Sequence, residues 1–68
     1  MSLVKTSSQP LQKLQEGDRF VKSKLGLPTL IVYEVLLINE QKEHVDCVNT
    51  ITHQLHLVNK FQLVFKLS

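Results

Sequence analysis

The chain has 68 residues and a mass of 7.8 kDa, so it forms one domain at most. Hydrophobic residues make up 43% and charged residues 21%, which is typical of a globular protein. A net charge of +2 and one cysteine exclude a strongly basic nucleic-acid clamp, an acidic tail protein, a disulfide framework and a Cys-rich zinc site. The chain holds 12 Leu, 8 Val, 3 Ile and no Ala. These residue types predict a mainly β protein.

Residues 1–15 are expected to form an N-terminal extension, and residues 16–68 the folded domain. Ser8 and Pro10 are typical of a helix start. Leu11 and Leu14 would then share one apolar stripe. A helix of about six residues is unstable alone. The extension is therefore expected to be a short helix docked on the domain, or disordered.

Five strands are predicted, over residues 18–24, 29–39, 44–49, 53–58 and 61–67. Gly26 and Pro28 separate the first two, and the polar segment 39–43 forms a hairpin loop of about five residues. Short loops make the strands antiparallel. The most compact arrangement is a small five-stranded SH3-like barrel. Its predicted core consists of Phe20, Val32, Val35, Leu37, Val45, Cys47, Leu55, Leu57, Leu63 and Phe65.

Residues 17–24 (Gly-Asp-Arg-Phe-Val-Lys-Ser-Lys) and the apolar strand after Gly26 resemble the opening of short bacterial SH3-like proteins of the YodC-like kind. That family's pattern is Gly-Asp-x-Val-x-x-Lys-Ser-Gly-Gly-Pro. Here Gly26-Leu27 replaces the Gly-Gly pair, and Val48 follows Cys47 where the family usually has Trp. The resemblance implies the fold and no particular activity.

A shorter stretch resembles the plasmid-borne type II dihydrofolate reductases, which are SH3-like chains that assemble in fours around a pore. Their pore motif Val-Gln-Ile-Tyr corresponds here to His53-Gln54-Leu55-His56. Gln54 matches and Leu55 is a conservative replacement, whereas both histidines differ. This resemblance implies a nicotinamide-dependent reductase.

The histidines and the cysteine are expected to be structural. His53 and His56 point to opposite faces of a strand, because the side-chain period is two, and His44 with Asp46 provides only two ligands. Cys47 alternates with Val45 and is expected in the core. We therefore expect no catalytic residue, cofactor or metal.

Glu34 interrupts an otherwise apolar strand. It is expected to mark a bend at which one face of the strand becomes solvent-exposed. The alternative is a buried carboxylate paired with Lys22 or Arg19. No second carboxylate has a fixed spacing to it, so acid–base catalysis has no pair of groups.

Two surfaces are expected to contact partners. One is a basic stripe along the first and last strands, suited to nucleic acid or to a protein partner; it consists of Arg19, Lys22, Lys24, Lys60 and Lys66. The other lies on segment 30–38, which is apolar on both faces, and would form a homodimer interface; it consists of Ile31, Tyr33, Leu36 and Ile38. Alternatively, Leu11 and Leu14 cover this second surface within one chain.

The favoured hypothesis is a non-catalytic interaction module that self-associates, most simply as a homodimer. Another protein is the second partner considered under this hypothesis. The second is a nucleic-acid-binding small barrel, and the third is the pore reductase. No secretory signal is visible, and the longest apolar stretch, 30–38, is far shorter than the ~20 residues of a membrane helix. A cytoplasmic location and no membrane partner are expected.

Overall fold

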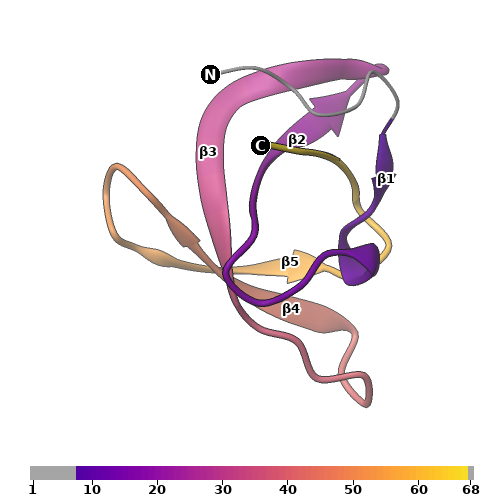
Figure 1. Cartoon of the computed structure of the whole chain (residues 1–68), viewed down its shortest axis with the longest axis vertical. Coiled ribbons are helices and arrows are strands. Elements are labelled where there is room, and N and C mark those ends of the chain that lie inside the picture. The colour runs from indigo at the N-terminus through magenta and orange to yellow at the C-terminus, as the bar shows by residue number, and fades with distance from the viewer. Residues whose placement is uncertain (1–7, 68) are drawn as a thin grey trace.

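A computed structural model describes residues 8–67 of the chain as one antiparallel β-sheet (Figure 1). Its elements are β1 (Gln9–Pro10), the 3-10 turn η1 (Leu11–Lys13), β2 (Arg19–Lys24), β3 (Leu27–Leu37), β4 (His44–Asn49), β5 (Leu55–Asn59) and β6 (Leu63–Lys66). The prediction of an all-β protein is confirmed, and each of the five predicted strands overlaps a strand of the sheet. Among the described residues, no helix is long and apolar enough to cross a bilayer.

The strand order is β1-β6-β2-β3-β4-β5. The last strand therefore returns to pair with β2, where Val21 opposes Phe65. The sheet is open, with β1 and β5 at its two edges. This pairing places the first and last predicted strands side by side, as expected from the sequence.

Residues 9–14, part of the extension predicted over residues 1–15, contribute to the sheet and its core. Gln9 and Pro10 pair with β6, and η1 is a single 3-10 turn rather than a longer helix. Leu11 and Leu14 are buried in the main core. A chain this short has few apolar residues, so these leucines are needed to fill it. Residues 1–7 lie outside the described residues.

β3 has two irregularities in its pairing, which lie on either side of Glu34, the residue at which a bend was predicted. Residues 29–31 lie opposite Lys22 alone, because Val21 pairs with Val32 and Ser23 with Pro28. A second bulge places Leu36 between the paired residues Val35 and Leu37. Bulges sharpen the twist of a strand, and β3 accordingly curves along one side of the molecule (Figure 1).

Two apolar clusters lie on opposite faces of the sheet, because neighbouring strand residues such as Phe20 and Val21 point to opposite sides. We call the face that carries Phe20 the inner face and the other the outer face. The main cluster on the inner face contains Leu11, Leu14, Phe20, Tyr33, Val35, Val45, Cys47, Val58 and Val64. A smaller outer cluster contains Val21, Phe65 and Leu67, with the half-buried Val32 packed against it.

Four of the ten predicted core residues are instead exposed: Leu37, Leu55, Leu57 and Leu63. In β5 the phase is shifted by one residue, because Val58 opposes Val45 and His56 opposes Cys47. These pairs place the even-numbered residues of β5 inward and its leucines outward. In β6, Val64 takes the inner position expected of Leu63, and the Leu36 bulge turns Leu37 outward.

Candidate functional site

The outer face of β3, β4 and β5 carries four exposed leucines, Leu36, Leu37, Leu55 and Leu57, which we call the outer patch. Leu37 and Leu57 flank Asp46 across the strands. Leu55 opposes Val48, which in turn opposes Glu34. Leu55 and Leu57 are each 61% exposed. The outward face of an antiparallel sheet is normally polar, so the outer patch is the candidate binding surface.

The predicted interface residues divide between surface and core. Ile31 and Leu36 are exposed. Tyr33 is not available to a partner, because it is buried and stacks on Phe20 with ring centroids 5.6 Å apart. Ile38 packs against the main cluster. The bulges explain this split, since they change which residues of β3 point outward.

Leu55 and Leu57 belong to the outer patch but not to the interface expected from the sequence. Their alternation with His56 and Val58 showed that they share a face. The sequence did not show whether that face is the inner or the outer one, because Leu55 and Leu57 are apolar and the alternating set, His56 and Val58, also contains an apolar residue. Leu11 and Leu14 pack in the main cluster on the inner face, so they do not cover the outer patch.

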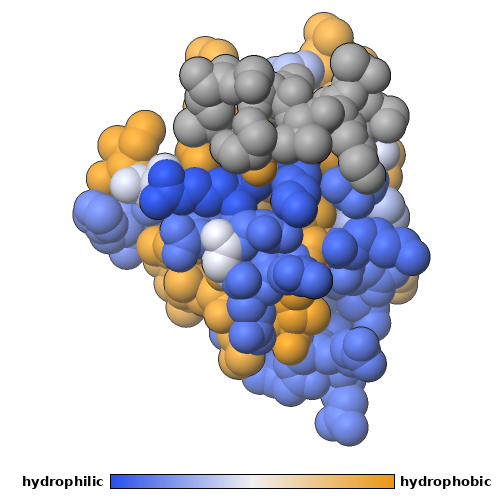
Figure 2. Space-filling view, in the orientation of Figure 1, coloured by the Kyte–Doolittle hydropathy of each residue, from blue (hydrophilic) through white to orange (hydrophobic). Residues whose placement is uncertain are grey.

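A second apolar surface lies at the tip of the β2–β3 hairpin. Leu25, Leu27 and Leu30 are highly exposed there. Leu25 has a φ of 54° and Gly26 a φ of 78°, which are the left-handed conformations that a tight hairpin turn needs. Figure 2 shows apolar side chains at the upper margin, along β3 and this hairpin, and at the left margin, where the β4–β5 hairpin projects.

The five cationic residues of the predicted basic stripe do not share one face. Arg19 points to the outer face, whereas Lys22 and Lys24 alternate with Val21 and Ser23 and point to the inner face. Four of the five already have partners. Arg19 Nε lies 3.3 Å from Glu34 Oε1, and Lys66 Nζ lies 3.7 Å from Asp18 Oδ2. Lys22 and Lys60 sit over the rings of Tyr33 and Phe61.

Glu34 combines the two alternatives considered for it. It is half-buried and forms an ion pair with Arg19, one of the two predicted partners. It also lies just before the Leu36 bulge, where β3 bends. An ion pair this exposed stabilises a protein by about 0–1 kcal/mol.

Cys47 lies in the core beside aromatic groups. Its Sγ donates a hydrogen bond to the carbonyl of Val45 at 3.5 Å. His56 opposes it on β5 and packs edge-on against Tyr33, with ring centroids 5.4 Å apart. Burial, with a smaller contribution from Asp46, raises the pKa of the thiol from 9.0 to about 11. A thiol held in its protonated form is a poor nucleophile, which agrees with a structural role.

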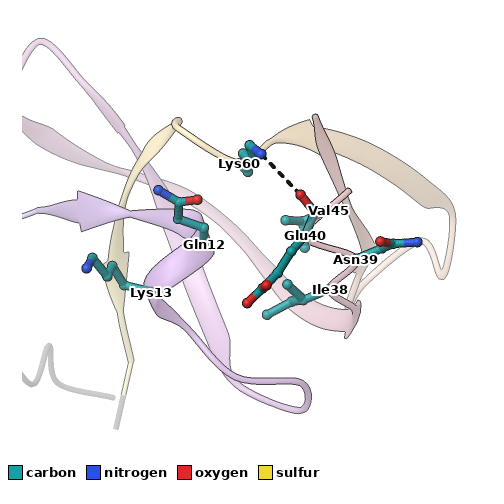
Figure 3. Close-up of a pocket in the computed structure, with 7 residues that line it drawn as sticks. All are labelled: Gln12, Lys13, Ile38, Asn39, Glu40, Val45 and Lys60. Atoms are coloured by element: carbon teal, nitrogen blue, oxygen red, sulfur yellow. Dashed lines mark hydrogen bonds between the residues drawn. The ribbon is translucent and has the colours of Figure 1, made fainter. Parts of the chain in front are cut away.

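A cleft of about 400 Å³ lies between η1 and the β3–β4 connection (Figure 3). It is lined by Gln12, Lys13, Ile38, Asn39, Glu40, Val45 and Lys60. Lys60 Nζ donates to the Glu40 carbonyl at 3.4 Å, and the Lys13 side chain extends away from the other lining groups. Its charged groups are the Glu40 carboxylate and the Lys13 and Lys60 ammonium groups.

The histidines are spread over the surface and the core. His44 and His53 are exposed, and His56 is half-buried. Within residues 8–67, His, Cys, Asp and Glu side chains form no group of three or more that could hold a metal ion. His53 to His56, the stretch resembling the reductase pore motif, runs from the β4–β5 connection into β5.

No family model, curated protein or solved structure matches this chain.

Proposed function

We propose that this protein is a non-catalytic interaction module that self-associates, most simply as a homodimer, through the part of the sheet that carries the outer patch. The observation that carries the proposal is the outer patch. Four leucines lie on the solvent side of β3 and β5, which flank β4, where an antiparallel sheet normally shows polar residues. A patch of a few hundred Å² of apolar surface is the size that marks an interface.

The size of the chain supports the same conclusion. A domain of about 60 residues buries only about 60% of its unfolded surface. Contacts between the outer patches of two copies would supply apolar packing that one chain lacks. The pairing of β6 with β2 also supports an SH3-like version of the fold, in which the first and last strands are neighbours.

The nucleic-acid alternative has less support, because four of the five cationic side chains contact a carboxylate or an aromatic ring and they divide between two faces. A homodimer and a nucleic-acid complex also differ in salt dependence, since phosphate contacts weaken steeply as salt rises.

Sedimentation velocity of the full chain at micromolar concentrations tests the proposal. We expect a particle of twice 7.8 kDa that dissociates on dilution and persists at high salt. A 7.8 kDa particle across the whole concentration range overturns self-association.

A further inference from the structure

The two edges of the sheet differ in how well they are protected. β1 has two residues, and its Pro10 has no N–H group to donate. β5 is longer, with five residues and no proline. Residues 53–59 contain no Asp, Glu, Lys or Arg, so charges do not protect this edge either. Among the described residues, no strand pairs with the free side of β5. An unprotected edge is a template for pairing with another strand.

The backbone groups that face this edge follow from the pairing with β4. Asn49 N donates to Gln54 O at 3.0 Å, and Lys60 N donates to Glu43 O at 2.9 Å, at the two ends of the ladder. Hydrogen-bonded pairs alternate with non-bonded pairs in an antiparallel ladder. Even-numbered residues of β5 therefore bond to β4. Leu55, Leu57 and Asn59 direct their N–H and C=O groups toward the free edge.

We propose that two copies of this chain pair along β5, antiparallel about a two-fold axis that passes beside Leu57. This inference rests on the proposed self-association and places the contact at the β5 edge, so that the two outer patches lie side by side on one face rather than packed against each other. A two-fold axis normal to the sheet brings residues of one face opposite each other, and the free backbone groups belong to odd-numbered residues. When Leu57 lies opposite Leu57 of the second copy, Leu55 lies opposite Asn59, so all five residues of β5 are paired.

This register joins two outer patches into one surface. The two Leu57 side chains meet at the axis, and Leu55 of each copy lies diagonal to Leu57 of the other. Two backbone bonds form between the Leu57 residues, and Asn59 N of each copy reaches Leu55 O of the other. The Asn59 carbonyl already accepts from Gln62 N at 3.0 Å. On the inner face, His56 opposes Val58.

Charge substitution tests whether Leu57 lies at the contact between the two copies. Leu57→Lys puts a charge at the axis, and the variant keeps its fold because the side chain already faces solvent. Leu27→Lys is the matched control on the hairpin tip, where Leu27 is 68% exposed. In sedimentation we expect wild type and Leu27→Lys to be dimers. We expect Leu57→Lys to stay monomeric even at protein concentrations tenfold above the wild-type dissociation constant.

A Leu57→Lys variant that dimerises like wild type overturns the β5 interface while self-association stands. A Leu27→Lys variant that alone becomes monomeric places the interface at the hairpin tip and also overturns the inference. A monomeric wild type overturns both the inference and the proposed function.

Cysteine cross-linking tests the register. A residue on a two-fold axis meets its own copy, and Cα atoms of a hydrogen-bonded pair lie about 5.5 Å apart, within disulfide range. Leu57→Cys should therefore form a covalent dimer under a mild thiol oxidant. Leu55→Cys has the same exposure and the same face, but it is offset from its copy by about 13 Å along the strand. Equal cross-linking of the two variants, or cross-linking of Leu55→Cys alone, overturns the Leu57-centred register. The wild-type chain, whose one cysteine is the buried Cys47, gives the background level of cross-linking.

Discussion

Replacement of Phe20 by alanine is expected to abolish folding. The Phe20 side chain is fully buried, and its ring stacks on Tyr33 at 5.6 Å. Deletion of a core aromatic ring costs about 3–5 kcal/mol, because the surrounding structure closes the cavity only in part. At about 0.05–0.15 kcal/mol per residue, a 68-residue chain has a free energy of unfolding of about 3–10 kcal/mol. The substitution therefore removes about a third or more of this free energy at the upper bound and all of it at the lower bound, and a chain this short, which buries a small fraction of its surface, is expected near the lower bound.

Phe61 provides the matched control, since it is the aromatic residue that is 61% exposed. Phe61→Ala loses a contact with Lys60, whose Nζ lies 5.3 Å from the ring, and should cost less than about 1 kcal/mol. Phe20→Leu keeps most of the apolar volume, so it should remain folded and give a measurable midpoint. Urea unfolding followed by circular dichroism compares the three variants at one protein concentration, because any dimer makes stability depend on concentration.

The expected order of stability is wild type and Phe61→Ala, then Phe20→Leu, with Phe20→Ala unfolded in buffer. A cooperative transition for Phe20→Ala near the wild-type midpoint would refute the assignment of Phe20 to the centre of the main cluster. An equal loss for the two alanine variants would show that burial does not govern stability here.

Three further predictions concern other contacts. Leu11→Ala should cost about 2–5 kcal/mol in urea unfolding, because Leu11 is fully buried, whereas Leu25→Ala, at 95% exposure, should leave the midpoint unchanged; equal midpoints would show that Leu11 is not part of the core. Asn49→Ala should cost about 1–3 kcal/mol of unfolding free energy, because the buried Oδ1 of Asn49 accepts from the N–H groups of Ile51 and Thr52 at 2.8 and 3.1 Å. Asn39→Ala is the control and should cost less, because it loses a single exposed hydrogen bond from Gln41 N. Cys47 should react with a thiol reagent far more slowly in the native protein than in denaturant, and native labelling at the denatured rate contradicts a core thiol. The free energy of unfolding should keep the full contribution of Cys47 below pH 9 and fall between pH 9 and 11, because folding raises the pKa of the thiol from 9.0 to about 11 and the unfolded state loses its proton first. A free energy of unfolding that rises over this range also contradicts a core thiol.

Strand composition was sufficient to identify the sheet. The β-rich residue choice, the turn at Gly26 and the polar segment 39–43 predict strands where β2, β3 and β4 lie. Alternation also identifies Val45 and Cys47 as core residues, because Asp46 between them marks the other face. Phe20 and Phe65 were expected in the core, and both are buried.

Where both alternating sets are apolar, the sequence could not assign a face. In β5, either Leu55 and Leu57 or His56 and Val58 can face the core, and composition favours the two leucines because leucine is buried more often than histidine. The pairing of Val58 with Val45 decides the phase, and it depends on the register between two strands rather than on either strand alone. The same is true of Tyr33, whose position in the core depends on its pairing with Phe20 of β2.

The sequence by itself determined the fold class, the approximate strand limits and the burial of Cys47, because these depend on local composition and on a period of two within one strand. Only the tertiary structure decided that Leu11 and Leu14 complete the core, that the outer patch consists of Leu36, Leu37, Leu55 and Leu57, and that β5 is an edge. These properties depend on which strands become neighbours and in what register. A shift of one residue exchanges the two faces of a strand without any change in its composition.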